Sequence, residues 1–392
     1  MTKDHTLMND SGKYPITSST RRDTRFDILR IAAMLLIVAC HFIANIGWHL
    51  ESPEAWLHGG PAMAADQLLG QVGSCLFFMI TGYFLVAKPF RARRIIDTVV
   101  QTFLYSALFL LLQAMLLMVH PTSGVVAMFS AERLPVTLYG TLLPVFNGAY
   151  WFITAYVLML AVSPYLNMVV TSSSRRTLTL IRLLLGISVM ALLSMTQLFW
   201  NNWCYAVTGY LIGGWIRTYG MDSAMLRRLR WGHVVVAAVA AYGVLAVFDY
   251  LAVEFDVMDW LKSDARYVTG MIPALSIIVA STIFMMVAKR VPHRRRAAVR
   301  ETSHRRAGTG KTLSATVFGV YLIHNNPYVR PNLWQAVTSM LPEPDSFVVG
   351  AGMGVVVVVA VFLTCAVCAF VYDAAVVRPV QRVVGRLLRL RG

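Results

Sequence analysis

Two ionisable side chains, Arg30 and His41, lie within the first long apolar segment, which extends from Ile28 to Trp48. Ionisable groups are costly inside a bilayer, so an intramembrane histidine is a candidate functional residue. A spacing of eleven residues is about three helical turns and places both side chains on one helix face, together with Asp27. At roughly 1.5 Å per residue, His41 would lie about 16 Å deeper than Arg30, near the middle of the hydrocarbon layer. The arginine could hold an anionic group at the membrane surface, and the imidazole could remove a proton deeper inside.

The composition predicts the structure that must position these residues. Of 392 residues, 57% are hydrophobic and 14% are charged, and the mean hydropathy is +0.61. Apolar runs long enough to cross a bilayer recur along the chain, so we expect an all-α polytopic membrane bundle of about ten transmembrane helices. The expected spans are 28–48, 66–87, 98–119, 150–170, 178–195, 203–220, 233–253, 267–288, 313–328 and 347–372.

The polar segments define the domain organisation. We expect a polar cytoplasmic N-terminal segment over 1–27, one transmembrane domain over 28–377 and a basic cytoplasmic tail over 378–392. The first apolar run is too long for a signal-peptide core and should be retained. An apolar segment over 137–150 is interrupted by proline and glycine, so it is expected to be re-entrant or interfacial.

The net charge of +16 is distributed in a way that predicts orientation. With the N-terminus inside, all but five of the 35 Lys and Arg residues fall in cytoplasmic segments, as the positive-inside rule requires. Both termini are therefore expected in the cytoplasm of a multi-pass plasma-membrane or bacterial inner-membrane protein. The most basic loop, Lys289 to Lys311, has no aromatic residue for base stacking, so we expect membrane lipids as its partners and no nucleic acid.

Other motifs do not support metal, disulfide or nucleotide sites. All five cysteines lie within expected spans, and the pair Cys365 and Cys368 has no nearby histidine, so we assign no metal and no disulfide framework. The sequence RAGTGKT lacks the first glycine of a phosphate-binding loop and follows no strand. A serine nucleophile elbow, G-x-S-x-G, does not occur.

A second cationic group follows the second span. Lys88, Arg91, Arg93 and Arg94 come directly after the apolar sequence LFFMITGYFL. Such clusters often act only as topogenic signals, although arginine can also bind phosphate bidentately. Because the first two spans run in opposite directions, this cluster should return to the surface where Arg30 lies, which suits a polyphosphate ligand.

Two further regions contain candidate residues on the expected outer side. The sequence YWFITAY, which includes Trp151, lies close to Asn147 and could stack on sugar rings, or it could form an ordinary interfacial aromatic belt. The sequence YLIHNN contains Tyr321 and His324, and His324 is equally consistent with a structural role and an acceptor-site role.

In combination, these motifs resemble the membrane-bound acyltransferase family 3. The similarity consists of R-x10-H at Arg30 and His41, R-x-x-R at Arg91 and Arg94, and the YLIH sequence, in that order over nearly the full chain. The resemblance implies acyl transfer from cytoplasmic acyl-CoA, with acetyl-CoA as the default donor and no permanently bound cofactor. It implies a hydroxyl of a cell-surface, secreted or lipid-linked carbohydrate as acceptor. It also implies that His41 is catalytic with Arg30, and that Arg30, Arg91 and Arg94 contact the donor.

The residues leave several alternatives open. His41 could act as a general base on the attacking hydroxyl or carry the acyl group itself. Candidate oxyanion donors are Tyr83, Asn147 and Tyr321, and Asp27 is a supporting candidate. A glycan or lipid transporter and a non-catalytic subunit of a glycan-assembly complex are the rival functions, because ionisable residues also mark transport pathways.

Overall fold

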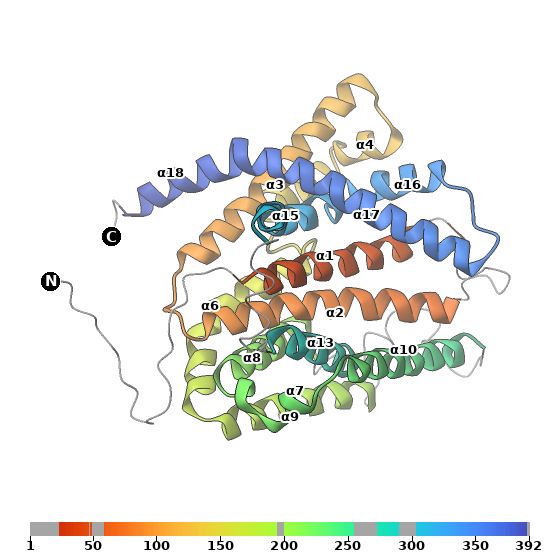
Figure 1. Cartoon of the computed structure of the whole chain (residues 1–392). Helices are drawn as coiled ribbons and strands as arrows, with labels where there is room; N and C mark the ends of the chain where they lie inside the picture. Colours follow the sequence, from red (N-terminus) through yellow and green to blue (C-terminus); the bar gives the residue numbers. More distant parts are fainter. Residues whose placement is uncertain are drawn as a thin grey trace.

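A computed structural model describes residues 23–46, 48, 59–193, 200–254, 273–289 and 303–389, in which every regular element is helical (Figure 1). The helices that correspond to the expected spans are α1 (Thr24–Asn45), α2 (Gly59–Leu85), α3 (Arg93–Val119), α6 (Trp151–Ser172), α7 (Ser174–Leu193), α8 (Asn202–Thr218), α10 (Trp231–Glu254), α13 (Pro273–Ala288), α15 (Ser303–His324) and α17 (Phe347–Tyr372). The other elements are α4 (Ser123–Met128), α5 (Leu134–Leu142), a 3-10 turn at Gly220–Asp222, α9 (Ala224–Arg228), α16 (Arg330–Met340), a π-helical turn at Asp373–Val377 and α18 (Arg378–Arg389).

Each of the ten expected spans overlaps one helix, so the all-α prediction is confirmed. Within the described ranges, 5 helices are long and apolar enough to cross a membrane, and three shorter apolar helices accompany them. The chain is therefore a multi-pass membrane protein by its helices, while the ten crossings stay a prediction. α5 has nine residues and is too short to cross a bilayer at about 1.5 Å per residue.

Several helix boundaries differ from the expected ones, and two of these differences affect motifs. α3 begins at Arg93, five residues earlier than expected, so Arg94 belongs to its first turn. α15 begins at Ser303, well before the expected start at 313, and therefore includes the end of the basic loop. The RAGTGKT sequence lies within this helix, which agrees with its rejection as a phosphate-binding loop.

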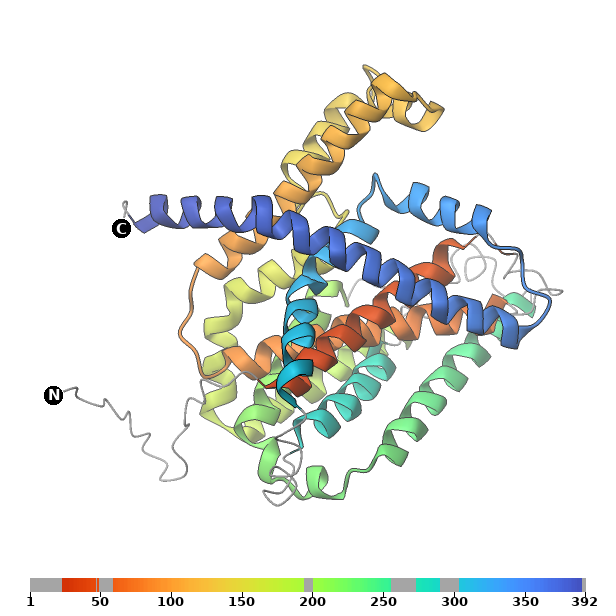
Figure 2. The ribbon, with the colours of Figure 1, turned by 45° about the horizontal axis from the view of Figure 1, so that its top comes forward.

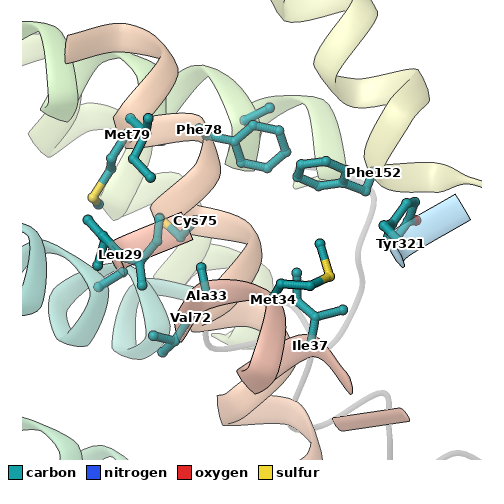
Figure 3. Packing of buried hydrophobic residues seen from close by; sticks show 14 of the residues in the cluster. Leu29, Ala33, Met34, Ile37, Val72, Cys75, Phe78, Met79, Phe152 and Tyr321 are labelled. Carbon is teal, nitrogen blue, oxygen red and sulfur yellow. The ribbon is translucent and has the colours of Figure 1, made fainter. Parts of the chain in front are cut away.

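The centre of the bundle is the antiparallel pair α1 and α2. α2 also packs against α8, α10 and α13, whereas α1 packs against α15 and α17. Figure 2 shows α15 crossing α1, with α17 running over both and the α3–α4 region projecting away from the bundle. The side chains between the two central helices include Leu29 and Ala33 of α1 and Val72, Cys75 and Met79 of α2 (Figure 3).

Glycines allow the backbones of α2 and α8 to approach closely. A Cβ atom on Gly82 would collide with the Tyr210 carbonyl group, and one on Gly213 would collide with that of Met79. Small residues permit such close approach where lipid supplies no hydrophobic force between helices. We call this contact the α2–α8 seam, and it fixes the C-terminal parts of both helices relative to each other.

A buried polar contact connects α3 to the end of α17. The Tyr105 hydroxyl and the Gln101 amide donate to one carboxylate oxygen of Asp373, at 2.9 and 3.1 Å. Asp373 is 5% exposed and begins the π-helical turn. α17 also exposes a row of apolar side chains, which suits contact with lipid tails. These side chains are Val348, Val355, Val356, Leu363, Val367 and Val371.

Candidate active site

Two histidines from distant parts of the chain meet at one end of the bundle. His41 lies one turn before the end of α1, and His324 is the last residue of α15. The Nδ1 atom of His41 lies 2.9 Å from the Nε2 atom of His324. His324 is fully buried and its own Nδ1 lies 2.6 Å from the carbonyl oxygen of Val320. We call this region the histidine end.

The hydrogen bonds of the pair determine where its protons lie. A carbonyl oxygen can only accept, so Nδ1 of His324 carries a hydrogen and donates to Val320. In a neutral His324, Nε2 is then the acceptor and His41 must donate to it from Nδ1. A neutral His41 has only that one hydrogen, so its Nε2 has a free lone pair. The geometry leaves that atom able to accept a proton or attack an acyl group.

Buried hydrogen bonds hold the turn that follows His324. The Asn326 amide donates to the hydroxyl of Tyr150 at 2.7 Å, and its oxygen accepts from the backbone N–H of Tyr328 at 2.9 Å. The Tyr321 hydroxyl accepts from Asn325 at 3.1 Å. The two asparagine side chains and the rings of Tyr150 and Tyr321 are buried. The end of α15 and the start of α6 are therefore fixed to each other beside the histidines.

The opposite end of α1 carries the predicted arginine. Arg30 donates to Asp27 at 3.0 Å, and the same carboxylate oxygen accepts from the Ser314 hydroxyl at 2.9 Å. The Arg30 guanidinium lies 5.6 Å from the centre of the Phe84 ring, at the end of α2. Asp27 thus orients Arg30 and joins α1 to α15 at this end, which we call the arginine end.

Three further arginines lie near the ends of neighbouring helices. Arg94 donates to the carbonyl oxygen of Pro89 at 3.1 Å, and Arg91 is exposed, with no side-chain hydrogen bond or ion pair among the described residues. Arg93 differs, because it pairs with Asp97 at 2.8 Å and also donates to the backbone near α18. Arg93 therefore has a structural role in joining α3 to α18, which leaves Arg91 and Arg94 for a ligand.

Arg217, at the end of α8, is a further cation at the arginine end. The sequence did not indicate it as a candidate. Its guanidinium lies 5.1 Å from the centre of the Tyr83 ring and donates to the Tyr83 hydroxyl at 3.3 Å. Tyr83 contacts Phe84, the ring beneath Arg30, with centroids 5.3 Å apart. Arg217 and Arg30 therefore lie on adjoining rings. No residue spacing in the sequence relates α8 to α1. The proximity of Arg217 to Arg30 is therefore apparent only from the packing of the helices.

Aromatic side chains extend between the two ends. Phe152 stacks on Phe78 at 4.9 Å and contacts Tyr321, beside His324, at 5.5 Å (Figure 3). Its other neighbour is Tyr156, at 6.1 Å. The Tyr156 hydroxyl interacts electrostatically with both Arg30 and Arg94. Tyr156 is about one and a half turns into α6, farther along the helix than Trp151, and the position of YWFITAY near the outer surface stays a prediction.

The structure does not bring every candidate residue to the histidines. Tyr83 lies against Phe26, at 4.8 Å between centroids, which is about four helical turns from His41 along α1. The Asn147 amide donates to the carbonyl oxygen of Gly140 in α5 at 2.8 Å and accepts from the backbone N–H of Ala149 at 3.0 Å. Trp151 packs edge-on to Phe152 at 6.1 Å. Of the three oxyanion candidates, Tyr321 is the one whose ring contacts that of His324, with centroids 6.1 Å apart.

The helix bounds locate His41 along α1. α1 begins at Thr24, so His41 is about 26 Å from its start and about 6 Å from its end, at roughly 1.5 Å per residue. Arg30 and His41 lie on one continuous helix, as expected, and the depth of His41 in the hydrocarbon layer stays a prediction.

Comparison with known families identifies the fold. Residues 23–373 match the Acyltransferase domain of the acyltransferase 3 family model. The chain belongs to the acyltransferase 3 family. This membrane acyltransferase contains both the histidine end and the arginine end within the matched residues. No curated protein and no solved structure matches the acyltransferase.

Proposed function

We propose that this acyltransferase moves an acyl group, by default acetyl, from cytoplasmic acyl-CoA to a carbohydrate hydroxyl. The acceptor would be a cell-surface, secreted or lipid-linked glycan at a bacterial plasma or inner membrane, supplied by glycan-assembly proteins. The observation that carries the proposal is the hydrogen bond from His41 to His324, which leaves Nε2 of His41 with a free lone pair. A sugar hydroxyl is a poor nucleophile, and a base in hydrogen-bond reach makes it competent.

The arginine end suits the donor. CoA carries phosphate groups, and guanidinium groups bind phosphate through paired hydrogen bonds. Arg30, Arg91 and Arg94 are the proposed donor contacts, with Arg217 as an addition from the packing. The predicted topology places these residues at the cytoplasmic surface. Arg30 and His41 are about 16 Å apart along α1, so the extended pantetheine arm of the donor would run along the helix between them.

The proposed reaction uses the free nitrogen of His41. The acceptor oxygen attacks the thioester carbon while Nε2 takes its proton, and the carbonyl electrons move to oxygen. When the tetrahedral intermediate collapses, the C–S bond breaks and the CoA thiolate takes the proton from His41. In the alternative course, Nε2 attacks the thioester carbon, and the C–S bond breaks to release the CoA thiolate. The acceptor hydroxyl then attacks the acyl carbon, the bond from this carbon to Nε2 breaks, and the hydroxyl proton passes to the thiolate. Both courses need the same tautomer, which His324 would maintain.

The test is transfer from labelled acetyl-CoA by the purified protein. We expect CoA release, and label in alkali-labile esters of a surface polysaccharide from the expressing cell. His41→Ala should abolish both, while His120→Ala, which alters an exposed histidine at the end of α3, should leave them unchanged. Glycan movement without thioester cleavage would instead favour a transporter, and neither activity would favour a structural subunit. An active, folded His41→Ala protein would refute the mechanism.

Label that remains on the protein distinguishes the two courses. With labelled acetyl-CoA and no acceptor, an acyl-His41 intermediate would add one acetyl group to the wild-type protein and none to His41→Ala. Direct transfer would leave both proteins unlabelled. Intact-protein mass spectrometry after rapid quenching measures this difference.

A further inference from the structure

α16 presents one face to the end of α1 that carries His41. Arg330 and Trp334 are four residues apart on this helix and so lie on the same face. Trp334 is 1% exposed, and its ring lies 6.0 Å from that of Phe42, the residue after His41. The face of α16 that carries Arg330 therefore turns toward the histidine end.

The turn after His324 also leads Arg330 back to this site. The backbone N–H of Arg330 donates to the carbonyl oxygen of Asn326 at 2.8 Å, and Asn326 is held by Tyr150. The Arg330 side chain is exposed and has no hydrogen bond or ion pair among the described residues. Its charge interacts electrostatically with both His41 and Tyr321. Among the described residues, Arg330 is thus an exposed cation without an ion pair, close enough to interact with the histidine end.

The position of Arg330 is unfavourable for a base at His41. A positive charge near His41 opposes the formation of a second positive charge on its ring. The cost is offset if negative charge develops near both groups in the same step. Acyl transfer creates such a charge, because the carbonyl oxygen becomes an oxyanion as the hydroxyl proton moves to His41.

We propose that Arg330 is a catalytic residue whose guanidinium stabilises the oxyanion of the tetrahedral intermediate. This inference rests on the proposed function and adds the electrostatic group that function requires. The oxyanion forms when the carbonyl π electrons move to oxygen, and it disappears when they return and expel the CoA thiolate. Arg330 donates hydrogen bonds throughout and exchanges no proton or electron. The Tyr321 ring lies next to that of His324, with centroids 6.1 Å apart.

The test uses acetyl-CoA cleavage with water as acceptor, which passes through the same kind of oxyanion. Arg330→Gln removes the charge, Arg330→Lys keeps it without the planar fork, and Arg133→Gln is a matched control at the start of α5, which packs against α3. We expect Arg330→Gln to lower kcat about 10²- to 10³-fold, with the KM for acetyl-CoA unchanged. Arg330→Lys should recover part of the loss, and Arg133→Gln should behave as wild type.

Two acceptor probes separate this role from recognition of an anionic glycan. Methyl β-D-glucopyranoside is neutral, and methyl β-D-glucuronide carries a carboxylate. An oxyanion role predicts the same loss of kcat for water and for either glycoside that is acylated. A loss seen only as a raised KM for the glucuronide would overturn the proposal in favour of acceptor binding.

Protein stability and the wild-type rate provide two further tests of the role of Arg330. Because the Arg330 side chain makes no hydrogen bond among the described residues, Arg330→Gln should unfold at the wild-type temperature, which circular dichroism in detergent measures. A folded Arg330→Gln protein with wild-type kcat would refute the inference and leave the proposed function intact. A wild-type protein that fails to cleave acetyl-CoA would refute the proposed donor and the inference with it.

Discussion

Replacing His324 tests whether its hydrogen bond to His41 determines the reactive nitrogen. In His324→Ala, Nδ1 of His41 loses its partner at 2.9 Å, and the ring is free to adopt either tautomer and other orientations. A buried hydrogen-bonding group left without its partner costs about 1–3 kcal/mol. At about 1.4 kcal/mol per tenfold change in rate, the expected loss of kcat is roughly 5- to 150-fold. Loss of the base itself, in His41→Ala, should cost about 10²- to 10⁴-fold.

The assay is CoA release from acetyl-CoA, measured with a thiol reagent over a range of pH. The KM for acetyl-CoA should not change in His324→Ala, because the arginine end lies far from His324. Added imidazole should restore part of the rate by occupying the space left by the ring, which a purely structural loss would not allow. His120→Ala is the matched control. A folded His324→Ala protein with wild-type kcat and pH profile would refute the assignment of His324 as a positioning residue.

Four further substitutions address the donor site and the packing. Arg94→Gln and Arg217→Gln should each raise the KM for acetyl-CoA several-fold with little change in kcat, because phosphate contacts position the donor; unchanged KM values in a donor titration would contradict this. Gly213→Ala should lower the unfolding temperature in detergent, since its Cβ collides with backbone, whereas Gly124→Ala, with nothing within 4 Å, should not. Asp27→Asn should reduce donor affinity by freeing the Arg30 guanidinium, and it should keep its serine hydrogen bond; wild-type affinity would argue against an orienting role.

The sequence predicted the features that depend on one helix at a time. Arg30 and Asp27 lie on one face of α1 because helical periodicity fixes which side chains are neighbours, and their 3.0 Å ion pair agrees with this expectation. The ten apolar segments coincide with helices because only a regular hydrogen-bonded backbone is stable in lipid. The antiparallel order of α1 and α2 follows from the short connection between them, and it correctly places Tyr83 and Phe26 at the same end of the bundle.

Features that depend on packing between distant helices were beyond this reasoning. His41 and His324 are 283 residues apart, and no periodicity relates α1 to α15. Tyr83 was a candidate oxyanion donor from its residue type, but its depth in α2 sets it against Phe26 at the arginine end. Nothing in the sequence was a reason to select Arg217, which the packing of α8 against α2 brings onto the Tyr83 ring. Amphipathic patterns show which face is buried, not which neighbour covers it.

The α2–α8 seam also limits how the bundle can move during turnover. Backbone atoms there approach so closely at Gly82 and Gly213 that neither helix can rotate or slide past the other without a collision. A path for the donor must therefore open elsewhere in the bundle. α2 and α8 behave as one rigid unit in this movement. Because Tyr83 and Arg217 both belong to this unit, the cation on α8 keeps its place while α1, α15 or α6 adjusts around a bound substrate.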